Sequence, residues 1–292
     1  MHTYLPAVGF KNINSRKKIR EILRDVVEHF DEKTTVENYG DGLFTEFTRY
    51  YAKRCGISVC GVFEEDNTFH IDYYYPFFRG KEVTSKQPVT VQRHAEKDSF
   101  AGACDDYRIG VTLIFYLQNP AAYMKDHKEG GTEEKPLFLT GLAKEGTILL
   151  PLKKDQADVE AEKEQSRVRG DLIAAAMDGD EEAMETLTVE DMDTYSMISE
   201  RITTEDVFTI VDSYFMPNGN ECDQYSLMGE ILEVESVKNH LTGEDVFLMS
   251  LDCNDVVFEI CINHQDLLGE PEIGRRFKGI IQLQGRLSDE VQ

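Results

Sequence analysis

The sequence predicts an α+β protein in which two strand-rich parts flank an acidic helical segment. Alternating apolar and polar residues, the pattern of half-buried strands, recur up to residue 152 and again from residue 207. Turn residues divide both stretches into short runs. The residues between them are rich in Glu, Asp and Ala and follow helical spacing. We therefore expect an α+β domain at residues 1–152, an acidic linker and helical segment at 153–205, and a small β-barrel at 206–292.

The N-terminal domain begins with one amphipathic helix followed by strands. Ser15 is the predicted N-cap, and apolar residues recur from Ile19 to Phe30 at helical spacing. Asp66-Asn67 is a hairpin turn between two aromatic-rich strands. Further strands are expected at Val89–His94, Tyr107–Leu117, Leu137–Leu142 and Thr147–Leu152, with a short helix at Asn119–His127. This order favours a mainly antiparallel sheet with few helices.

The acidic segment predicts a helical hairpin. Its turn is Asp178-Gly179-Asp180, and apolar residues such as Leu172 and Leu187 can face each other across it. Thr188 and Asp191 have the spacing of a capping box, which predicts that a third helix starts there and runs to about Arg201. Residues 153–170 are typical of a charged linker or an exposed helix.

The C-terminal part predicts a small barrel. Five strands are expected, at Val207–Met216, Tyr225–Val237, Val246–Cys253, Val256–Asn263 and Arg276–Leu287. Five short strands in so few residues favour a closed or nearly closed barrel, similar in size to the oligonucleotide/oligosaccharide-binding (OB) fold. One short helical turn is expected at HQDLL, directly before the last strand, whereas the OB fold has its helix one strand earlier. We therefore predict a five-stranded barrel without assigning that named fold.

Acidic residues are unevenly distributed along the chain, whose formal net charge is −24. Residues 1–154 hold 22 acidic and 22 basic residues, residues 155–206 hold 17 and 4, and residues 207–292 hold 16 and 5. A negative field of this strength repels nucleic-acid phosphates and anionic membranes. It serves solubility or, alternatively, attracts a protein partner with a basic surface.

Hydropathy and cysteine usage predict the compartment. No run approaches the ~20 apolar residues that a membrane span needs. The first residues contain no uninterrupted apolar stretch of the kind found in signal peptides. None of the six cysteines forms a C-x-x-C pair, which fits reduced, buried thiols. The prediction is a cytoplasmic protein.

Positive charge returns in the last predicted strand, within GEPEIGRRFKGIIQLQGRL. The Gly spacing resembles a phosphate-binding loop, but no Lys-Ser/Thr pair and no helix follows it, so we reject that function. Strand alternation places Arg276, Lys278 and Arg286 on one polar face. Three roles stay open: pairing with acidic neighbouring strands, an anion- or ligand-binding face, and docking of the acidic helices of residues 155–206. Pairing is the simplest role, and we prefer docking to a ligand site.

The densest group of potentially reactive side chains lies in RHAEKDSFAGACDDYR, residues 93–108. His94 could be a general base oriented by Glu96, and Cys104 a nucleophile. His94, Glu96 and Asp105 could equally bind a divalent cation. An ordinary polar loop between two strands has the same composition, and it is the interpretation we favour.

Four stretches of the sequence resemble, in order, a known family: MHTYLPAVGF, RHAEKDSFAGACDDYRIGVTLIFYLQNP, DLIAAAMDGDEEAMETLTVEDMDTYS and CINHQDLLGEPEIGRRFKG. It is an uncharacterised domain-of-unknown-function family of cytoplasmic proteins from clostridial Gram-positive bacteria, with members of about this length. The resemblance spans nearly the whole chain. It implies a bacterial cytoplasmic protein with this domain order, and it implies no activity, cofactor or catalytic residue.

The sequence therefore predicts a non-enzymatic cytoplasmic protein that binds a partner or a ligand. One alternative is an enzyme, hydrolase-like or metal-dependent, centred on residues 93–108. Another is single-strand nucleic-acid binding by the barrel, which the acidity of residues 207–292 disfavours. We expect no cofactor, no bound metal and no membrane contact. A protein partner, if one binds, should have a basic surface.

Overall fold

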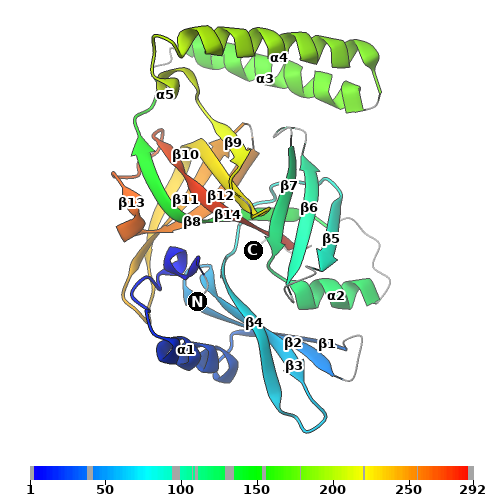
Figure 1. Ribbon diagram of the computed structural model, residues 1–292, viewed down its shortest axis with the longest axis vertical. Helices are drawn as coiled ribbons and strands as arrows, with labels where there is room; N and C mark the ends of the chain where they lie inside the picture. The colour runs from blue at the N-terminus through cyan, green and yellow to red at the C-terminus, as the bar shows by residue number, and fades with distance from the viewer. Residues whose placement is uncertain are drawn as a thin grey trace.

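Two β-sheets and a long helical hairpin make up the molecule (Figure 1). The computed structural model describes residues 3–37, 42–93, 99–106, 108, 111–128, 135–152, 156–177, 179–219, 221–254 and 256–288. A 4-stranded sheet has the order β1-β2-β3-β4. A 10-stranded sheet has the order β13-β8-β12-β11-β10-β14-β7-β6-β5, with β9 paired to β10. This architecture confirms the predicted α+β class with an antiparallel N-terminal sheet. Among the described residues, no helix is long and apolar enough to cross a membrane.

The smaller sheet is antiparallel and packs against the first helix. Its strands are β1 (Glu32–Glu37), β2 (Leu43–Ala52), β3 (Cys55–Phe63) and β4 (Phe69–Phe78). The Ser15 side chain accepts a hydrogen bond from the Lys18 amide and caps α1 (Arg16–Glu28), as predicted. The apolar stripe of α1, which includes Ile22 and Val26, is buried against β2 and β3.

Five strands close into a barrel, in the order β8-β12-β11-β10-β14, with β14 pairing back to β8. They are β8 (Leu137–Leu149), β10 (Gln224–Lys238), β11 (Asp245–Cys253), β12 (Val256–Asn263) and β14 (Arg276–Leu287). A short 3-10 helix, η2 (His264–Asp266), and β13 (Leu267–Leu268) follow β12. Alternate residues, among them Ile260, Phe277 and Leu283, form one buried apolar cluster. Neighbours such as Leu248 and Cys261 belong to the cluster with α1.

The fifth strand of the barrel is β8, and the prediction of a strand at Val207–Met216 in that place is wrong. Val207–Ile210 forms a helix, α5, whose first turn is capped by the Asp206 side chain, and only Tyr214–Pro217 forms a strand, β9. β8 itself is one continuous strand rather than the predicted two joined by a turn. Its pairing with β14 skips Lys144, so a β-bulge stands where the turn was expected. The barrel thus includes a strand from residues 1–152, and the division into three domains stays a prediction.

A three-stranded antiparallel unit extends the large sheet beyond the barrel. β5 (Val89–Arg93), β6 (Phe100–Asp106) and β7 (Val111–Leu117) pair in order, and β7 runs parallel to the end of β14. The helix α2 (Pro120–Lys128) follows β7 and contacts β1 and β2. It therefore lies where the smaller sheet, β7 and the end of β14 meet.

The acidic segment forms two helices that stand away from both sheets (Figure 1). They are α3 (Gln156–Met177) and α4 (Glu181–Arg201), and the side chain of Asp180 caps α4. Gly179 has a φ of 92° in the predicted turn, a conformation that glycine adopts at little cost. The predicted third helix is wrong, because α4 continues through Thr188. The Thr188 hydroxyl donates to the Met184 carbonyl one turn back instead of capping a new helix.

Hydrogen bonds from barrel side chains hold the first described residues in place. Leu5–Val8 forms a 3-10 helix, η1, and the side-chain amides of Asn239 and Asn263 donate to two of its carbonyls. Glu244 accepts from Asn263 and from two backbone amides that follow η1. Gly9 has a φ of 87°, and a Cβ there would lie 2.8 Å from Asn239 Cβ. This close approach explains the glycine in the MHTYLPAVGF stretch.

Candidate functional site

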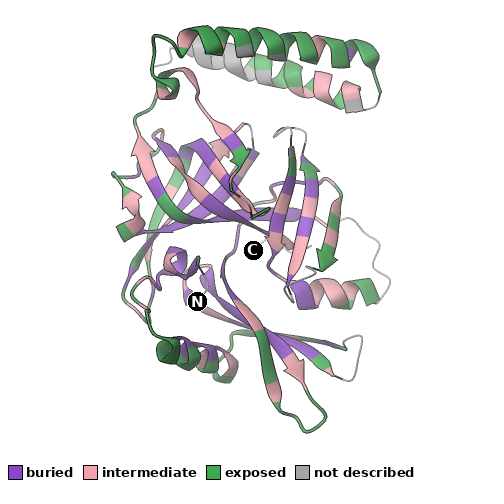
Figure 2. Ribbon diagram, in the orientation of Figure 1, coloured by how far each residue is buried: buried purple, intermediate pink, exposed green. Residues whose placement is uncertain are grey.

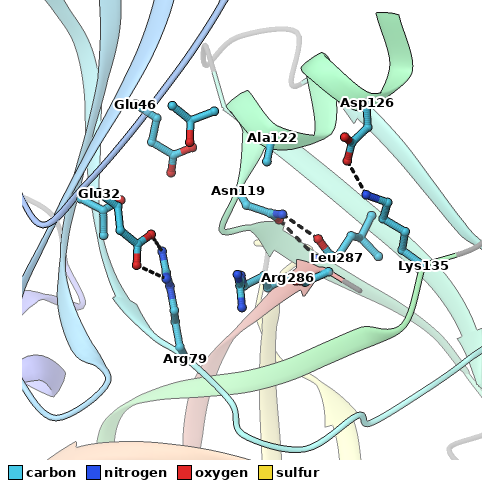
Figure 3. Close-up of a pocket in the computed structure, with 12 residues that line it drawn as sticks. Glu32, Glu46, Arg79, Asn119, Ala122, Asp126, Lys135, Arg286 and Leu287 are labelled. Atoms are coloured by element: carbon cyan, nitrogen blue, oxygen red, sulfur yellow. Dashed lines mark hydrogen bonds and ion pairs between the residues drawn. The ribbon is translucent and has the colours of Figure 1, made fainter. Parts of the chain in front are cut away.

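A polar pocket of about 290 Å³ lies where the smaller sheet, α2 and the end of β14 meet (Figure 3). Its described lining comes from several separate parts of the chain. The lining residues are Glu32, Thr34, Glu46, Thr48, Arg79, Asn119, Ala122, Asp126, Lys135, Arg286, Leu287 and Ser288. Half of these side chains are ionisable, so charge dominates the chemistry of the pocket.

Arg79 and Glu32 form a fixed ion pair in the pocket wall. Both terminal nitrogens of Arg79 donate to the Glu32 carboxylate, at 2.7 and 2.8 Å. The Arg79 side chain is buried, and its guanidinium lies 5.2 Å from the ring centroids of Tyr50 and Phe77. Burial alone would raise the pKa of Glu32, but hydrogen bonds from Arg79 and Tyr50 hold it below its ordinary value. Glu32 is therefore an anion whose charge Arg79 matches.

Glu46 is a buried carboxyl group that points into the same pocket (Figure 3). The Tyr75 hydroxyl oxygen lies 2.6 Å from Glu46 Oε1 and 2.6 Å from the Gln118 carbonyl oxygen. A hydroxyl has one proton, and a carbonyl oxygen can only accept. When Tyr75 donates to Gln118, its short contact with Glu46 therefore needs a proton on the carboxyl group.

Burial favours the same protonated state of Glu46. It raises the pKa of this carboxyl to about 7, in opposition to the lowering effect of the hydrogen bond with Tyr75. The Ala121 amide, in the first turn of α2, lies 3.4 Å from the other carboxyl oxygen and is too distant to offset the burial. Glu46 is thus neutral below about pH 7.

Arg286 reaches the pocket from the last strand. The Asn119 side chain fixes this end of β14, because its Nδ2 donates to the Leu287 carbonyl at 2.7 Å and its Oδ1 accepts from the Leu287 amide at 3.3 Å. Arg286 is half-buried, and its guanidinium lies on the side of the pocket that holds Arg79 and Glu32 (Figure 3). Its charge contributes to the lowered pKa of Glu32.

The described charges of the lining do not cancel while Glu46 is protonated. Arg79 pairs with Glu32, and Lys135 pairs with Asp126. Arg286 adds a third positive charge, and Glu46 is the remaining acid of the described lining. Below about pH 7, when Glu46 is neutral, the described lining presents three basic side chains and two carboxylates.

Sequence patterns identified one charged member of this pocket, Arg286, and missed the others. Glu46 lies in TEFTRY, where Thr45 and Thr48 are also buried. Three polar residues inside a strand covered on both faces were the available signal, since such groups need buried partners. Arg79 directly follows an aromatic strand, and nothing local distinguishes it from a surface arginine.

Residues 93–108 are not the single polar loop that we expected, because Phe100–Asp106 forms strand β6, and this strand separates two of the candidate residues. Cys104 and Asp105 are neighbours on β6, so their side chains project to opposite faces of the strand. Cys104 is buried in an apolar cluster, burial raises the pKa of its thiol, and Asp105 accepts a hydrogen bond from Thr112. His94 and Glu96 lie outside the described residues. A catalytic or metal site that includes them stays a prediction.

Arg276 lies at the base of the helical hairpin. It is buried, and its Nε donates to the Leu150 carbonyl at 3.2 Å. Its two terminal nitrogens donate to the carbonyls of Val211, at 3.0 Å, and Phe208, at 2.8 Å. Leu150 precedes the hairpin, whereas Phe208 and Val211 follow it. One guanidinium thus holds the two chain segments that lead into and out of the hairpin.

The three predicted cations of β14 do not share one surface. Lys278 Nζ lies 4.2 Å from the centroid of the Phe208 ring, beside Arg276. Arg286 pairs with Phe138 at the opposite end of β14 and lines the pocket. The hydrogen bonds of Arg276 to backbone carbonyls and the ring contact of Lys278 are with residues that flank the hairpin. Docking of residues 155–206 themselves stays a prediction.

In the described part of the chain, no three His, Cys, Asp or Glu side chains gather in a way that could hold a metal ion.

Comparisons with known proteins place the chain in a family. No curated protein and no solved structure matches the chain. One family matches residues 5–285, and its description reads "Domain of unknown function, E. rectale Gene description (DUF3881)". Because this match covers nearly all of the 292 residues, the chain belongs to that family of domains of unknown function.

Proposed function

We propose that this protein is a non-enzymatic, cytoplasmic protein that binds a small carboxylate in the pocket between β1, β2, α2 and the end of β14. The observation that supports this most is the position of the Arg286 guanidinium, which lies beside the Arg79–Glu32 ion pair in a polar pocket. A volume of about 290 Å³ suits a small metabolite, because ligand pockets usually span ~300–1,000 Å³.

Arg286 is the side chain that we assign to the ligand carboxylate. A guanidinium binds a carboxylate through two parallel N–H···O bonds, which fix the orientation of the ligand as well as its charge. Asn119 holds the backbone beside Arg286 in place. Thr34, which also lines the pocket, offers a hydroxyl group to the rest of a polar ligand.

The described lining favours binding over catalysis. It includes no cysteine or histidine, and two of its three acids, Glu32 and Asp126, are held in ion pairs. Nucleophilic catalysis usually pairs the attacking side chain with a neighbouring general base, most often a histidine. All six cysteines are free thiols, which supports a reducing compartment such as the cytoplasm.

The proposal is tested with a panel of small mono- and dicarboxylates and inorganic phosphate, by thermal shift and calorimetric titration near pH 6. We expect a carboxylate to raise the melting temperature. Arg286→Gln should weaken its binding about tenfold or more, because a charge-assisted bidentate contact is lost. Arg20→Gln removes the same charge from the exposed surface of α1 and should leave binding unchanged. Unaltered binding by Arg286→Gln, binding of phosphate alone, or no stabilisation by any probe would each refute the proposal.

A further inference from the structure

The helical hairpin is an appendage with little cover from the rest of the molecule. The main packing partner of α3 is α4, and Figure 1 shows both helices above the barrel. Ala183 and Leu187 lie on the covered side of α4, where they are buried or half-buried. Figure 2 shows that most of the α4 ribbon is exposed. A two-helix hairpin covers one face of each helix, so the opposite faces depend on something outside the hairpin for burial.

The outer face of α4 combines apolar and acidic side chains. Val189 is 53% exposed and Met192 is 65% exposed, and their spacing makes them neighbours on the helix surface. The outer patch of α4, as we define it, consists of these two residues with Glu185, Asp193, Ser196 and Glu200, all of them exposed. Neighbouring exposed apolar side chains that are surrounded by polar ones are a feature of protein–protein interaction sites.

The hairpin does not neutralise its own acidity. Residues 155–206 hold 17 acidic and 4 basic residues, a net charge of −13. The described arginines of this segment are all engaged. Arg167 pairs with Glu164 and Asp171, Arg169 with Glu190, and Arg201 with Glu205. None of these pairs includes an acid of the outer patch.

Two cations at the base of the hairpin do not provide the missing charge. Arg276 donates to backbone carbonyls at the base of the hairpin, and Lys278 lies against the Phe208 ring. A second copy of this chain would present another segment of net charge −13, and like charges at this density repel. Charge complementarity therefore selects a basic partner.

We propose that the outer patch of α4 binds a basic, amphipathic segment of another protein. Apolar side chains of the partner would cover Val189 and Met192, and its lysines or arginines would pair with Glu185, Asp193 and Glu200. Helices commonly recognise such segments through apolar anchors at helical spacing, with surrounding charges that set orientation and association rate. This interaction is independent of ligand binding in the pocket.

The test uses the full-length protein and a labelled peptide of about 20 residues in which Lys and Leu alternate at amphipathic helical spacing. Binding is followed by fluorescence anisotropy at about 50 mM and about 300 mM sodium chloride. Three variants are compared with the wild type. The first is Glu185→Gln/Asp193→Asn/Glu200→Gln, the second is Val189→Gln/Met192→Gln, and the third, a matched control on other exposed surface, is Glu21→Gln/Glu28→Gln/Glu65→Gln.

We expect the charge variant to bind about fivefold more weakly at low salt, and the apolar variant to lose affinity at both salt concentrations. The control should bind like the wild type, and amide exchange should show protection of α4 by the peptide. Equal loss in the control would mean that the peptide senses only overall charge, which overturns the proposal. Unchanged binding by the apolar variant, or self-association abolished by Val189→Gln/Met192→Gln, would overturn it as well.

Discussion

Glu46 carries a proton that belongs to the folded structure. Its pKa is about 7 in the folded chain, because burial disfavours the carboxylate, against an ordinary value of 4.5. Between these two pH values the folded state binds more protons than the unfolded state. The stability that this group contributes is therefore fully present below pH 4.5 and is lost as the pH rises towards 7.

Glu46→Gln should remove this pH dependence. The amide stays neutral and keeps a donor for the Tyr75 hydroxyl, so the variant avoids burying an ionised group. Between pH 5 and pH 8, the free energy of unfolding of the variant should rise by about 2–3 kcal/mol relative to that of the wild type. Urea unfolding at the two pH values measures the difference. Glu65→Gln, at an exposed turn, should show no such change. A pH-independent difference for Glu46→Gln would mean that Glu46 is not the buried acid described here.

Residue patterns identify charge more readily than they identify burial. Arg286 stood out in the sequence because it lies in a cationic cluster within an acidic half of the chain. Arg79 and Glu46 did not, because their partners are distant in the sequence. Glu32, the partner of Arg79, lies on β1, and Tyr75, the partner of Glu46, lies on β4. Only tertiary packing makes these side chains into a pocket, so the sequence could not predict it.

At the scale of elements, β14 connects the base of the hairpin with the pocket. Its first residue, Arg276, holds the base of the hairpin, and its eleventh, Arg286, lines the pocket. Between them, Gln284 is fully buried and donates to the Pro76 carbonyl of β4. The predicted apolar face of this strand, including Phe277, Ile281 and Leu283, is buried as expected. On the polar face, Arg276, Gln282 and Gln284 are buried as well, and each bonds to a different segment of the chain. Strand alternation cannot reveal these contacts.

Arg276→Gln should loosen the base of the hairpin without opening the barrel. A glutamine side chain is too short to reach the three carbonyls of Leu150, Phe208 and Val211 together. We expect the free energy of unfolding to fall by about 2 kcal/mol, since three partly buried hydrogen bonds lose their charged donor. Amide exchange should accelerate in α5. Lys278→Gln, which removes a contact with one ring, should have a smaller effect. Faster exchange in β14 with α5 unchanged would contradict the assignment.

Errors in the predicted elements had local physical causes. Residues 207–210, VFTI, are β-branched or aromatic and so have strand propensity, but the Asp206 side chain accepts from the Phe208 amide and favours a helical turn. Residues 143–146, AKEG, lie between two predicted strands and have the composition of a turn, yet β14 and β12 both pair with β8 around them. Capping overrides strand propensity in the first case, and pairing with distant strands overrides turn propensity in the second. The closed barrel was predictable because most of its strands are long and alternating.

At the scale of the whole molecule, the helical hairpin is an insertion into a barrel that closes without it. β8 precedes the hairpin and pairs along its length with β14, which lies at the end of the chain. Other contacts tie the smaller sheet to the same barrel. Arg54 donates to both carboxylate oxygens of Glu259 on β12, at 2.8 Å each. The N-terminal residues are therefore held to the C-terminal strands through several independent contacts.

Limited proteolysis tests this arrangement together with the predicted domain division. A protease should cut within Lys153–Gly170, because the described side chains there are exposed or half-buried and most are polar, and helix α3, to which they belong, lies outside both sheets. The two fragments should then remain associated on a native sizing column, because β8 stays paired with β12 and β14 across the cut. They should separate only in denaturant. Free elution of the N-terminal fragment without denaturant would show that β8 does not close the barrel, and first cuts inside residues 107–150 would show that the hairpin is not the most accessible segment.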